Sequence, residues 1–462
     1  TLGGSGGIAP GASAVAKNTL TSTVETIITD NATIPAHGIQ GGALTVAARH
    51  LNTDVVANSD ARSGHLAGLT GSFAQNTINS NVKTKVGDNT KLLSNGDILI
   101  EASSTATKRA DGDSAQAASG GLLDGAAASS ETQFHNKIET IIGHAEIRQI
   151  DHDQTTPNTL NIRAYANSIA DDTARLDSGG AIAIAKAESE IAAGSGTDHD
   201  YAKITINDGA FIRNETGDIN VGARTDATFN SQAYSKTYGL AGAAQGVSNS
   251  VINADNIITI GNSRLYAEGD LNLKSGGDDR ADNAVTMTAR TRLWNRTVIP
   301  MQTSPTANGE ANIASSITTA SGARLNAVAD IAILTTNQGI TADGIGKSQD
   351  LYQEAAEEVG NFFRGLVGAS PVTIEDTTTS SKKNVATTVT LNNTEVRAGF
   401  KNNQFLEISA TTVAAGPGGA YRKYVPVNNA NGDPIQSEGI EYDVHNNVAL
   451  ETSLRQKITD LE

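Results

Sequence analysis

The sequence contains no cysteine and few large side chains. Of its 462 residues, only 4% are aromatic, two are Met and one is Trp. The absence of cysteine excludes a disulfide scaffold, a zinc–thiolate site and an iron–sulfur cluster, and it suits a protein exported through an oxidising compartment. Because large side chains are scarce, the chain must bury Ala, Val, Ile, Leu and small polar residues instead.

Long apolar runs and positive charge are also scarce. No run approaches the roughly 18 apolar residues of a membrane-spanning helix, so we expect no membrane insertion. The chain carries 50 acidic and 34 basic residues, for a net charge of −16. This balance repels phosphate, so we expect no nucleic-acid partner. Because the chain starts at Thr1 and opens inside a repeat, we expect it to be a piece of a longer or processed protein.

A short segment recurs along the chain, namely a turn-like Gly, Asn or Asp followed by an alternating strand. It reads GDILIEA from Gly96, GDINVGA from Gly217 and GDLNLKS from Gly269. The first apolar residues of its seven copies are Leu44, Ile98, Leu160, Ile219, Leu271, Ile331 and Leu406. Their successive gaps are 54, 62, 59, 52, 60 and 75 residues, so the period is close to 60 with one long insertion.

A second segment precedes each copy, with a β-branched alternating strand, a Gly/Asn/Asp turn and a shorter apolar strand. It reads NKIETIIGHAEI from Asn136 and YAKITINDGAFI from Tyr201, and Gly/Ala-rich stretches such as SGGAIAIAKAES from Ser178 lie between the two segments. Alternation places one set of side chains on one face of each strand. In the second copy this inward set is Ile98, Ile100, Ala102, Ser104 and Ala106. It begins large and becomes small, which predicts a narrowing interior.

The repeat predicts an all-β fold, specifically a right-handed parallel β-helix, or solenoid. A period of 60 without a helical pattern predicts about three coils of roughly 20 residues each. Coils stack about 4.8 Å apart, so about twenty of them would form a rod of roughly 100 Å. Right-handedness follows from the strong preference of parallel crossovers. The bulky core of a β-sandwich array and the aromatic blade signatures of a propeller are both missing.

We expect the shaft of about 60-residue repeats to occupy residues 1–412, and an irregular, turn-rich segment to occupy 413–462. The long gap predicts a helix-bearing insertion over 341–383. The apolar side chains of its helix are Leu351, Ala355, Val359, Phe362 and Leu366. We interpret this stripe as packing on the flank of the shaft, with docking of a partner as the alternative. Residues 449–462 could form a short helix or the start of a linker.

The candidate partner-contact residues are Trp294, Arg292, Arg296, Phe362 and Phe363. The sole Trp lies between two arginines in a segment that we predict to be a loop. An aromatic ring flanked by Arg can stack on a sugar or hold an acidic polymer. The alternative is that Trp294 covers apolar surface beneath its own loop. The two phenylalanines belong to the predicted helix.

No catalytic motif is predicted, and the eight histidines are scattered without a pair at metal-ligand spacing. Acidic clusters fall at predicted turns, and we interpret them as solvated. These clusters are Asp111-Gly112-Asp113, Asp151-His152-Asp153, Asp198-His199-Asp200 and Gly277-Asp278-Asp279. The ion that such turns could hold is loosely bound Ca²⁺. We therefore expect no enzyme, with no catalytic, cofactor-binding or metal-ligating residue and no cofactor.

The combination of GDI-x-I, a Gly/Ala-rich coil and N-x-I-x-T-x-I followed by a turn resembles the β-helical repeats of very large secreted bacterial adhesins. These are the filamentous-haemagglutinin-like and leukotoxin-like filamentous adhesins, many of which are exported by two-partner secretion. The resemblance runs from about Val24 to about Ala410. It implies an extracellular or cell-surface fibre that serves cell adhesion, aggregation or a biofilm matrix.

The sequence thus predicts the structural shaft of an extracellular bacterial adhesin or surface fibre. Its expected partners are other copies of itself or a cell-surface or matrix polysaccharide. A self-assembling extracellular filament subunit is the alternative. A β-helix that binds or degrades polysaccharide is the third class, and a degrading enzyme would need paired carboxylates or an Asp/Arg/Lys cluster projecting from adjacent coils.

Overall fold

The computed structural model describes residues 1–8, 11–36, 42–109, 112–150, 157–300, 304–337, 339–349, 378–398, 405–412, 420–421, 426–428, 434–439 and 450–457. The regular elements in these ranges are β-strands, with no helix among them. The predicted all-β class is therefore confirmed. No described segment is a helix long and apolar enough to cross a membrane.

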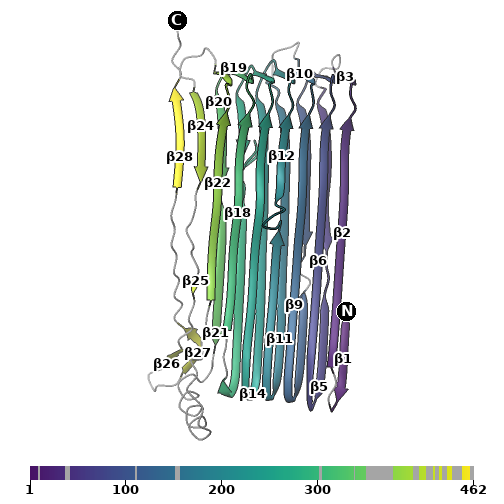
Figure 1. The fold of residues 1–462 in the computed structure, drawn as a ribbon, viewed down its shortest axis with the longest axis vertical. Coiled ribbons are helices and arrows are strands. Elements are labelled where there is room, and N and C mark those ends of the chain that lie inside the picture. The colour runs from purple at the N-terminus through teal and green to yellow at the C-terminus, as the bar shows by residue number, and fades with distance from the viewer. Residues whose placement is uncertain are drawn as a thin grey trace.

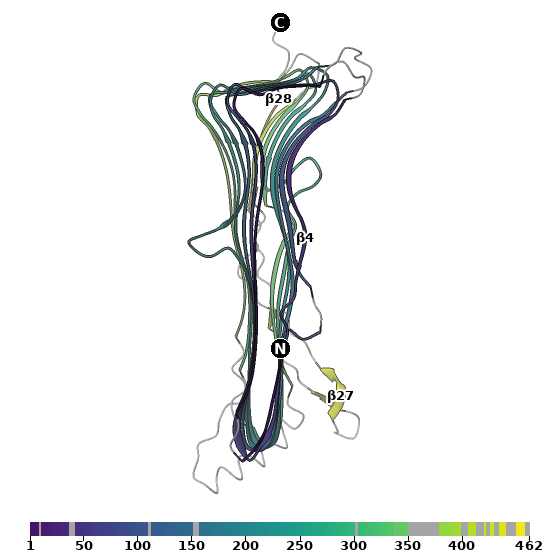
Figure 2. The same ribbon diagram turned by 90° about the vertical axis from the view of Figure 1, so that its right-hand side faces the viewer.

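The strands form two long walls joined by a short third side (Figure 1). In the view turned by 90°, the walls meet at a narrow bend at the lower end and separate toward the upper end, where short strands connect them (Figure 2). The short strands make a seven-stranded sheet: β3 Thr33–Ala36, β7 Lys91–Ser94, β10 Glu146–Gln149, β13 Phe211–Asn214, β15 Arg264–Ala267, β19 Arg324–Ala327 and β23 Glu395–Arg397. The described part of the chain also holds a two-stranded sheet, β26 Pro426–Asn428 and β27 Pro434–Gly439.

The walls belong to one 19-stranded sheet, in which β9, β11 and β14 each run through the narrow bend from one wall into the other. Its strands are β1 Leu2–Gly7, β2 Gly11–Ile28, β4 Leu44–Val55, β5 Ser59–His65, β6 Ala67–Val86, β8 Ile98–Lys108, β9 Ala115–Ile142, β11 Leu160–Ala193, β12 Asp200–Ile206, β14 Ile219–Ile260, β16 Leu271–Ser275, β17 Val285–Pro300, β18 Ser304–Thr319, β20 Ile331–Asn337, β21 Ile340–Gln349, β22 Thr378–Leu391, β24 Phe405–Thr412, β25 Ala420–Tyr421 and β28 Leu450–Lys457.

The predicted repeat positions stack in a single column of parallel pairs. Leu44 pairs with Ile98, Ile98 with Leu160, and the pairing continues without a break to Leu406. Each repeat of about 60 residues therefore passes once along the two walls and the short side. The expectation of three 20-residue coils per repeat is wrong, and so is the rod of roughly 100 Å. The long strands continue through the narrow bend, so the bend carries few of the Asn, Asp and Pro residues that normally mark a corner.

The GD pair of the repeat has a specific role at one upper corner. Asp218 Oδ1 accepts the backbone N–H of Asp270 at 2.8 Å, and Asp270 Oδ1 accepts that of Asp330 at 2.9 Å. A side chain on Gly269 would overlap with the Asp218 carboxylate. The glycine therefore makes room for the aspartate of the preceding coil, and the aspartate binds the next coil.

The interior narrows as the sequence predicts. Ile98, Ile100, Ala102, Ser104 and Ala106 are all buried, in that order from the upper end toward the bend. Ile, Leu and Val dominate the largest buried cluster, whereas a cluster nearer the bend consists almost entirely of Ala. The change in side-chain volume matches the approach of the two walls (Figure 2).

Glycines occupy the narrow bend because consecutive coils approach closely there. A side chain on Gly180 would overlap with the carbonyl oxygen of Gly121, and one on Gly239 would overlap with that of Gly180. Gly239 also has a φ of 144°, which other residues rarely adopt. The Gly/Ala-rich stretches of the sequence are therefore these bends.

One part of the predicted organisation lies outside the described residues, and another differs from the structure. The expected insertion over 341–383 is described only at its two ends, which belong to strands β21 and β22; its predicted helix lies outside the described residues. Within the segment predicted to be irregular, Leu450–Lys457 is strand β28, not a helix or linker. It pairs antiparallel with β24, where it satisfies backbone groups that a free sheet edge would leave open.

Candidate functional site

The structure places the predicted contact residues Arg292, Trp294 and Arg296 in strand β17 rather than in a loop. Their side chains alternate with the buried Thr291, Leu293, Asn295 and Thr297 and so point outward. Three of these four buried residues are polar, so the alternation of inward and outward side chains cannot be recognised from hydrophobicity alone. Phe362 and Phe363 lie outside the described residues.

Strand β14 brings three further side chains to the same surface. Tyr234 pairs with Arg292, Lys236 with Trp294, and Tyr238 with Arg296. These pairs lie 58 residues apart, so aligning the sequence at its own period would have found them. We call these six residues, Tyr234, Lys236, Tyr238, Arg292, Trp294 and Arg296, the aromatic–cationic face.

Cation–π contacts organise this face. The ammonium group of Lys236 lies 4.1 Å from the ring centre of Trp294, and the Arg292 guanidinium lies 5.8 Å from that of Tyr234. Partial burial lowers the pKa of Lys236. Among the described residues, Lys236, Arg292 and Arg296 form no ion pair within 4 Å, although the charge of Asp177, the Cα partner of Lys236, acts to raise the pKa of Lys236. The face therefore combines stacking surfaces with positive charge on an acidic protein.

A second polar cluster lies where the loop between β16 and β17 folds back over earlier coils. Arg163 of β11 donates from Nε to Asp279 Oδ1 at 2.6 Å, and Arg49 Nε donates to Glu101 Oε1 at 2.8 Å. The buried Asp278 accepts from Arg280 Nε at 2.8 Å. Asp278 and Asp279 are therefore engaged with arginines, and the expectation that they are solvated turn residues is wrong for Asp278.

The charges of this cluster stabilise one another. Burial alone would raise the pKa of Glu101, but the hydrogen bond and charge of Arg49, with help from Ser103 and Arg280, lower it overall. Burial likewise opposes ionisation of Asp278, whereas Arg280 and backbone N–H groups lower its pKa. Because arginines occupy its carboxylates, we interpret the cluster as a clasp that ties the loop to the wall.

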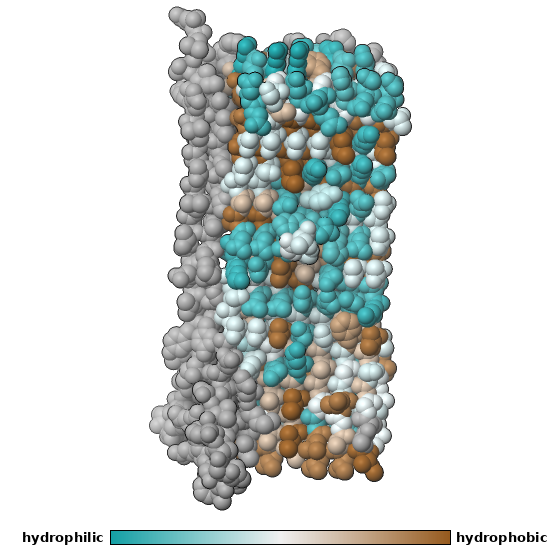
Figure 3. Space-filling view, viewed as in Figure 1, coloured by the Kyte–Doolittle hydropathy of each residue, from teal (hydrophilic) through white to brown (hydrophobic). Residues whose placement is uncertain are grey.

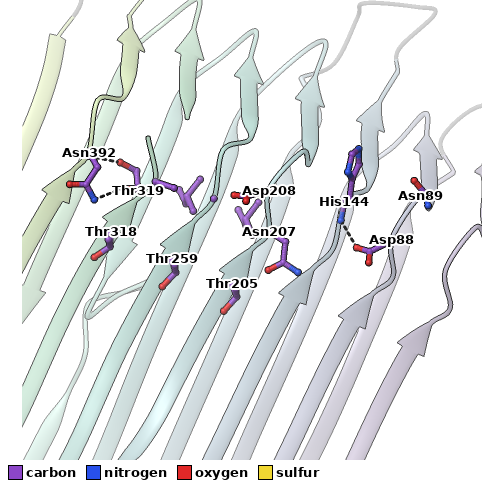
Figure 4. Close-up of a pocket in the computed structure, with 14 residues that line it drawn as sticks. Asp88, Asn89, His144, Thr205, Asn207, Asp208, Thr259, Thr318, Thr319 and Asn392 are labelled. Atoms are coloured by element: carbon purple, nitrogen blue, oxygen red, sulfur yellow. Dashed lines mark hydrogen bonds between the residues drawn. The ribbon is translucent and has the colours of Figure 1, made fainter. Parts of the chain in front are cut away.

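A groove of about 810 Å³, lined by both polar and aliphatic residues, crosses the coils at the other upper corner (Figure 4). Thr205, Thr259 and Thr318 are Cα partners on successive coils and line it at the coil spacing. Its carboxylates are engaged: Asp88 Oδ1 accepts the His144 backbone N–H at 2.7 Å, and Asp208 Oδ1 accepts that of Asn262 at 2.7 Å. The groove offers hydroxyl and amide groups to a hydrogen-bonding ligand.

A serine, a histidine and an aspartate meet inside the bend. Ser63 Oγ lies 3.0 Å from His65 Nδ1, and His65 Nε2 lies 3.1 Å from Asp124 Oδ1. Ser119 and Ser178 also donate to Asp124. The His65 and Asp124 side chains have no exposed surface, so a substrate carbonyl cannot approach them. The serines hydrogen-bond to His65 Nδ1 and Asp124 Oδ2, whereas His65 Nε2 and Asp124 Oδ1 lie at ion-pair distance but make no hydrogen bond among the described residues.

The remaining acidic clusters differ in environment. Asp200 is fully buried, and burial raises its pKa to about 8, although Asn136 donates to both carboxylate oxygens. Asp200 is therefore not a solvated turn residue, contrary to the interpretation from the sequence. Asp111, Asp151 and Asp153 lie outside the described residues. Within the described ranges, no group of three or more His, Cys, Asp or Glu side chains is arranged to hold a metal ion.

No family model, no curated protein and no solved structure matches this chain.

Proposed function

We propose that this chain is a non-catalytic structural segment of an extracellular bacterial adhesin or surface fibre, built as a right-handed parallel β-helix. The observation that supports this best is the unbroken column from Leu44 to Leu406. Backbone hydrogen bonds along such a column give a stiff body without a bulky core, and each coil contacts mainly its neighbours. The sequence resemblance to filamentous adhesins agrees with this use.

The size of each coil indicates that the segment presents a broad surface rather than extending as a long fibre. A wall of about 22 residues, from Leu160 to Ala181, spans about 70 Å, whereas each further coil of about 60 residues adds only about 4.8 Å. The segment is therefore a broad plate. Its wide faces would meet a cell-surface or matrix polysaccharide, or other copies of the chain.

A self-assembling filament subunit is the second candidate. In the described residues, β1–β4 pair on one side only, which leaves sheet edges that can accept another strand. At the opposite end, however, the antiparallel strand β28 occupies the β24 edge on which a further parallel coil would stack. This geometry favours the structural segment over the subunit.

Negative-stain electron microscopy over a concentration series tests the proposal. We expect separate plates with a longest dimension of about 70 Å at every concentration. Filaments of uniform width that lengthen with concentration would contradict the structural-segment proposal and support the polymerising subunit. In a second assay, the chain is incubated with purified acidic and neutral polysaccharides and the reducing ends are measured. Release of reducing ends would show that the chain is an enzyme.

A further inference from the structure

The narrow bend carries most of the large exposed hydrophobic side chains in the part of the chain that the structure describes. Ten of the fifteen large hydrophobic residues that are exposed in the described ranges lie there, each between 39% and 78% exposed. We call them the apolar edge: Ile8, Leu66, Leu69, Leu122, Leu123, Ile182, Ile184, Tyr238, Leu240 and Val298. Figure 3 shows hydrophobic side chains gathered at the lower end of the visible face, where the strands bend.

The apolar edge repeats with the coils. Leu66 hydrogen-bonds through its backbone to Gly7 of the preceding coil, and Leu122 to Leu66. Leu123 and Ile182 are Cα partners one coil apart. The exposed aliphatic side chains therefore form a continuous ridge across the stack. Contiguous apolar surface of this kind marks an interaction site.

The bends are also free of exposed charge. The stretches 63–72, 119–130, 178–185 and 237–251 contain one carboxylate, Asp124, and no Lys or Arg. The Asp124 side chain is wholly buried beside His65. The surface that the bends expose is therefore uncharged, on a chain with a net charge of −16.

The aromatic–cationic face adjoins this edge, and Tyr238 belongs to both. Tyr238 is two residues before Leu240, and Trp294 and Arg296 are four and two residues before Val298, all pointing outward. From the edge upward, the surface changes from aliphatic side chains to Tyr and Trp, together with Lys and Arg. Proteins that rest on a bilayer show this order, because aromatic rings settle at the headgroup level and cations reach lipid phosphates.

We propose that the apolar edge docks on an anionic phospholipid surface, with the aromatic–cationic face at headgroup level. The edge is only two walls thick, so it can enter the interface as a ridge about 5–10 Å deep. A protein partner would need about 800 Å² of complementary surface, which such a narrow ridge does not favour. Lys236, Arg292 and Arg296 match anionic headgroups, and the one acid beside Lys236, its Cα partner Asp177, lies at ion-pair distance from Arg175. This partner differs from those expected from the sequence.

Trp294 is the sole tryptophan, so it reports on docking directly. The intact chain is mixed with phosphatidylcholine vesicles with and without phosphatidylglycerol, and co-sedimentation and tryptophan emission are measured. We expect binding to the anionic vesicles, a blue shift of the emission, and quenching by lipids brominated on the acyl chain.

Two variants and one control separate the contributions. Leu66→Ser, Leu122→Ser and Leu240→Ser together should abolish binding, since these side chains are more than half exposed and form part of the edge. Gln in place of Lys236, Arg292 and Arg296 should weaken binding to anionic vesicles about 100-fold. The control replaces three exposed aliphatics away from the edge, Ile27, Leu51 and Ile169, by Ser and should bind normally.

Three results would overturn the proposal. The first is unchanged Trp294 emission and no co-sedimentation with anionic vesicles. The second is a concentration-dependent dimer that the edge variant abolishes, which would assign the edge to a second copy. The third is binding of an acidic polysaccharide without binding of vesicles, which would assign the cations to a polymer. None of these bears on the structural role proposed above, which electron microscopy tests separately.

Discussion

A buried ion pair between two coils gives the most demanding test of the packing. Lys108 at the end of β8 places its ammonium group 2.8 Å from Asp172 Oδ1 of β11, and the two side chains are 1% and 0% exposed. Lys108 also donates to Ser114 Oγ and to the Asp171 carbonyl, and Ser130 donates to Asp172 at 2.6 Å. The pair is therefore desolvated; Asp172 Oδ1 carries its hydrogen bonds, whereas Asp172 Oδ2 is buried without a hydrogen-bond partner among the described residues.

Replacing Asp172 by Ala should lower the free energy of unfolding by about 3–5 kcal/mol, because it leaves a buried ammonium group without a counter-charge. Lys108→Met should cost a similar amount. The double variant Lys108→Met/Asp172→Leu removes both charges and should cost less than either single variant, since the desolvation penalty disappears with the pair. The coupling free energy between the two positions should therefore exceed about 2 kcal/mol.

Urea unfolding followed by circular dichroism measures these differences at neutral pH. The thermal midpoint serves as a second readout, because stacked coils can unfold in parts. Single variants that cost less than about 1 kcal/mol, or costs that simply add, would show that Lys108 reaches water. The packing of the two coils at this depth would then be wrong.

Other positions give independent tests. Gly239→Ala should lower the free energy of unfolding by about 1–3 kcal/mol, because the new side chain would overlap with the preceding coil and the residue has a φ of 144°. Gly196→Ala, where a side chain would meet open space, should leave it unchanged in the same urea assay. The raised pKa of Asp200 makes the folded protein lose stability by about 1.4 kcal/mol per pH unit between the unfolded value of 3.8 and about 8, since only the folded state holds that proton. Asp200→Asn should remove this slope from the pH dependence of unfolding, and an unchanged slope would contradict the burial. Arg163→Ala should release the loop that carries Asp279, seen as faster amide exchange there, while exchange unchanged from the parent chain would refute the clasp.

Much of the fold could be predicted from the sequence because alternation and self-similarity are local signals. The column through Ile98 and Ile219 is the one that the GD pairs indicate. The number of coils could not be predicted in the same way. A corner is normally marked by Asn, Asp or Pro, whereas this bend is rich in glycine, alanine and aliphatic residues, which also fit a straight, narrow interior.

The candidate surface was predicted only in part. Arg292, Trp294 and Arg296 attract attention through their composition, but Tyr234 and Lys236 become partners only when the chain is aligned at its own period. The buried acidic residues show a second limit of prediction from the sequence. Local sequence places Asp200 at a turn, and only the neighbouring coils remove it from water.

The central claim is that each period of about 60 residues forms one coil, and engineered cysteine pairs test it in a chain with no cysteine of its own. Asn161 and Asn220 are Cα partners on adjacent coils, with side chains joined by a hydrogen bond of 2.9 Å. Asn161→Cys/Asn220→Cys should form an intramolecular disulfide under mild oxidation, because opposed residues on neighbouring strands meet the required spacing. Asn161→Cys/Ala181→Cys should not form one, since those positions lie far apart along the same strand. A disulfide in the second variant and none in the first would contradict the account and restore coils of about 20 residues.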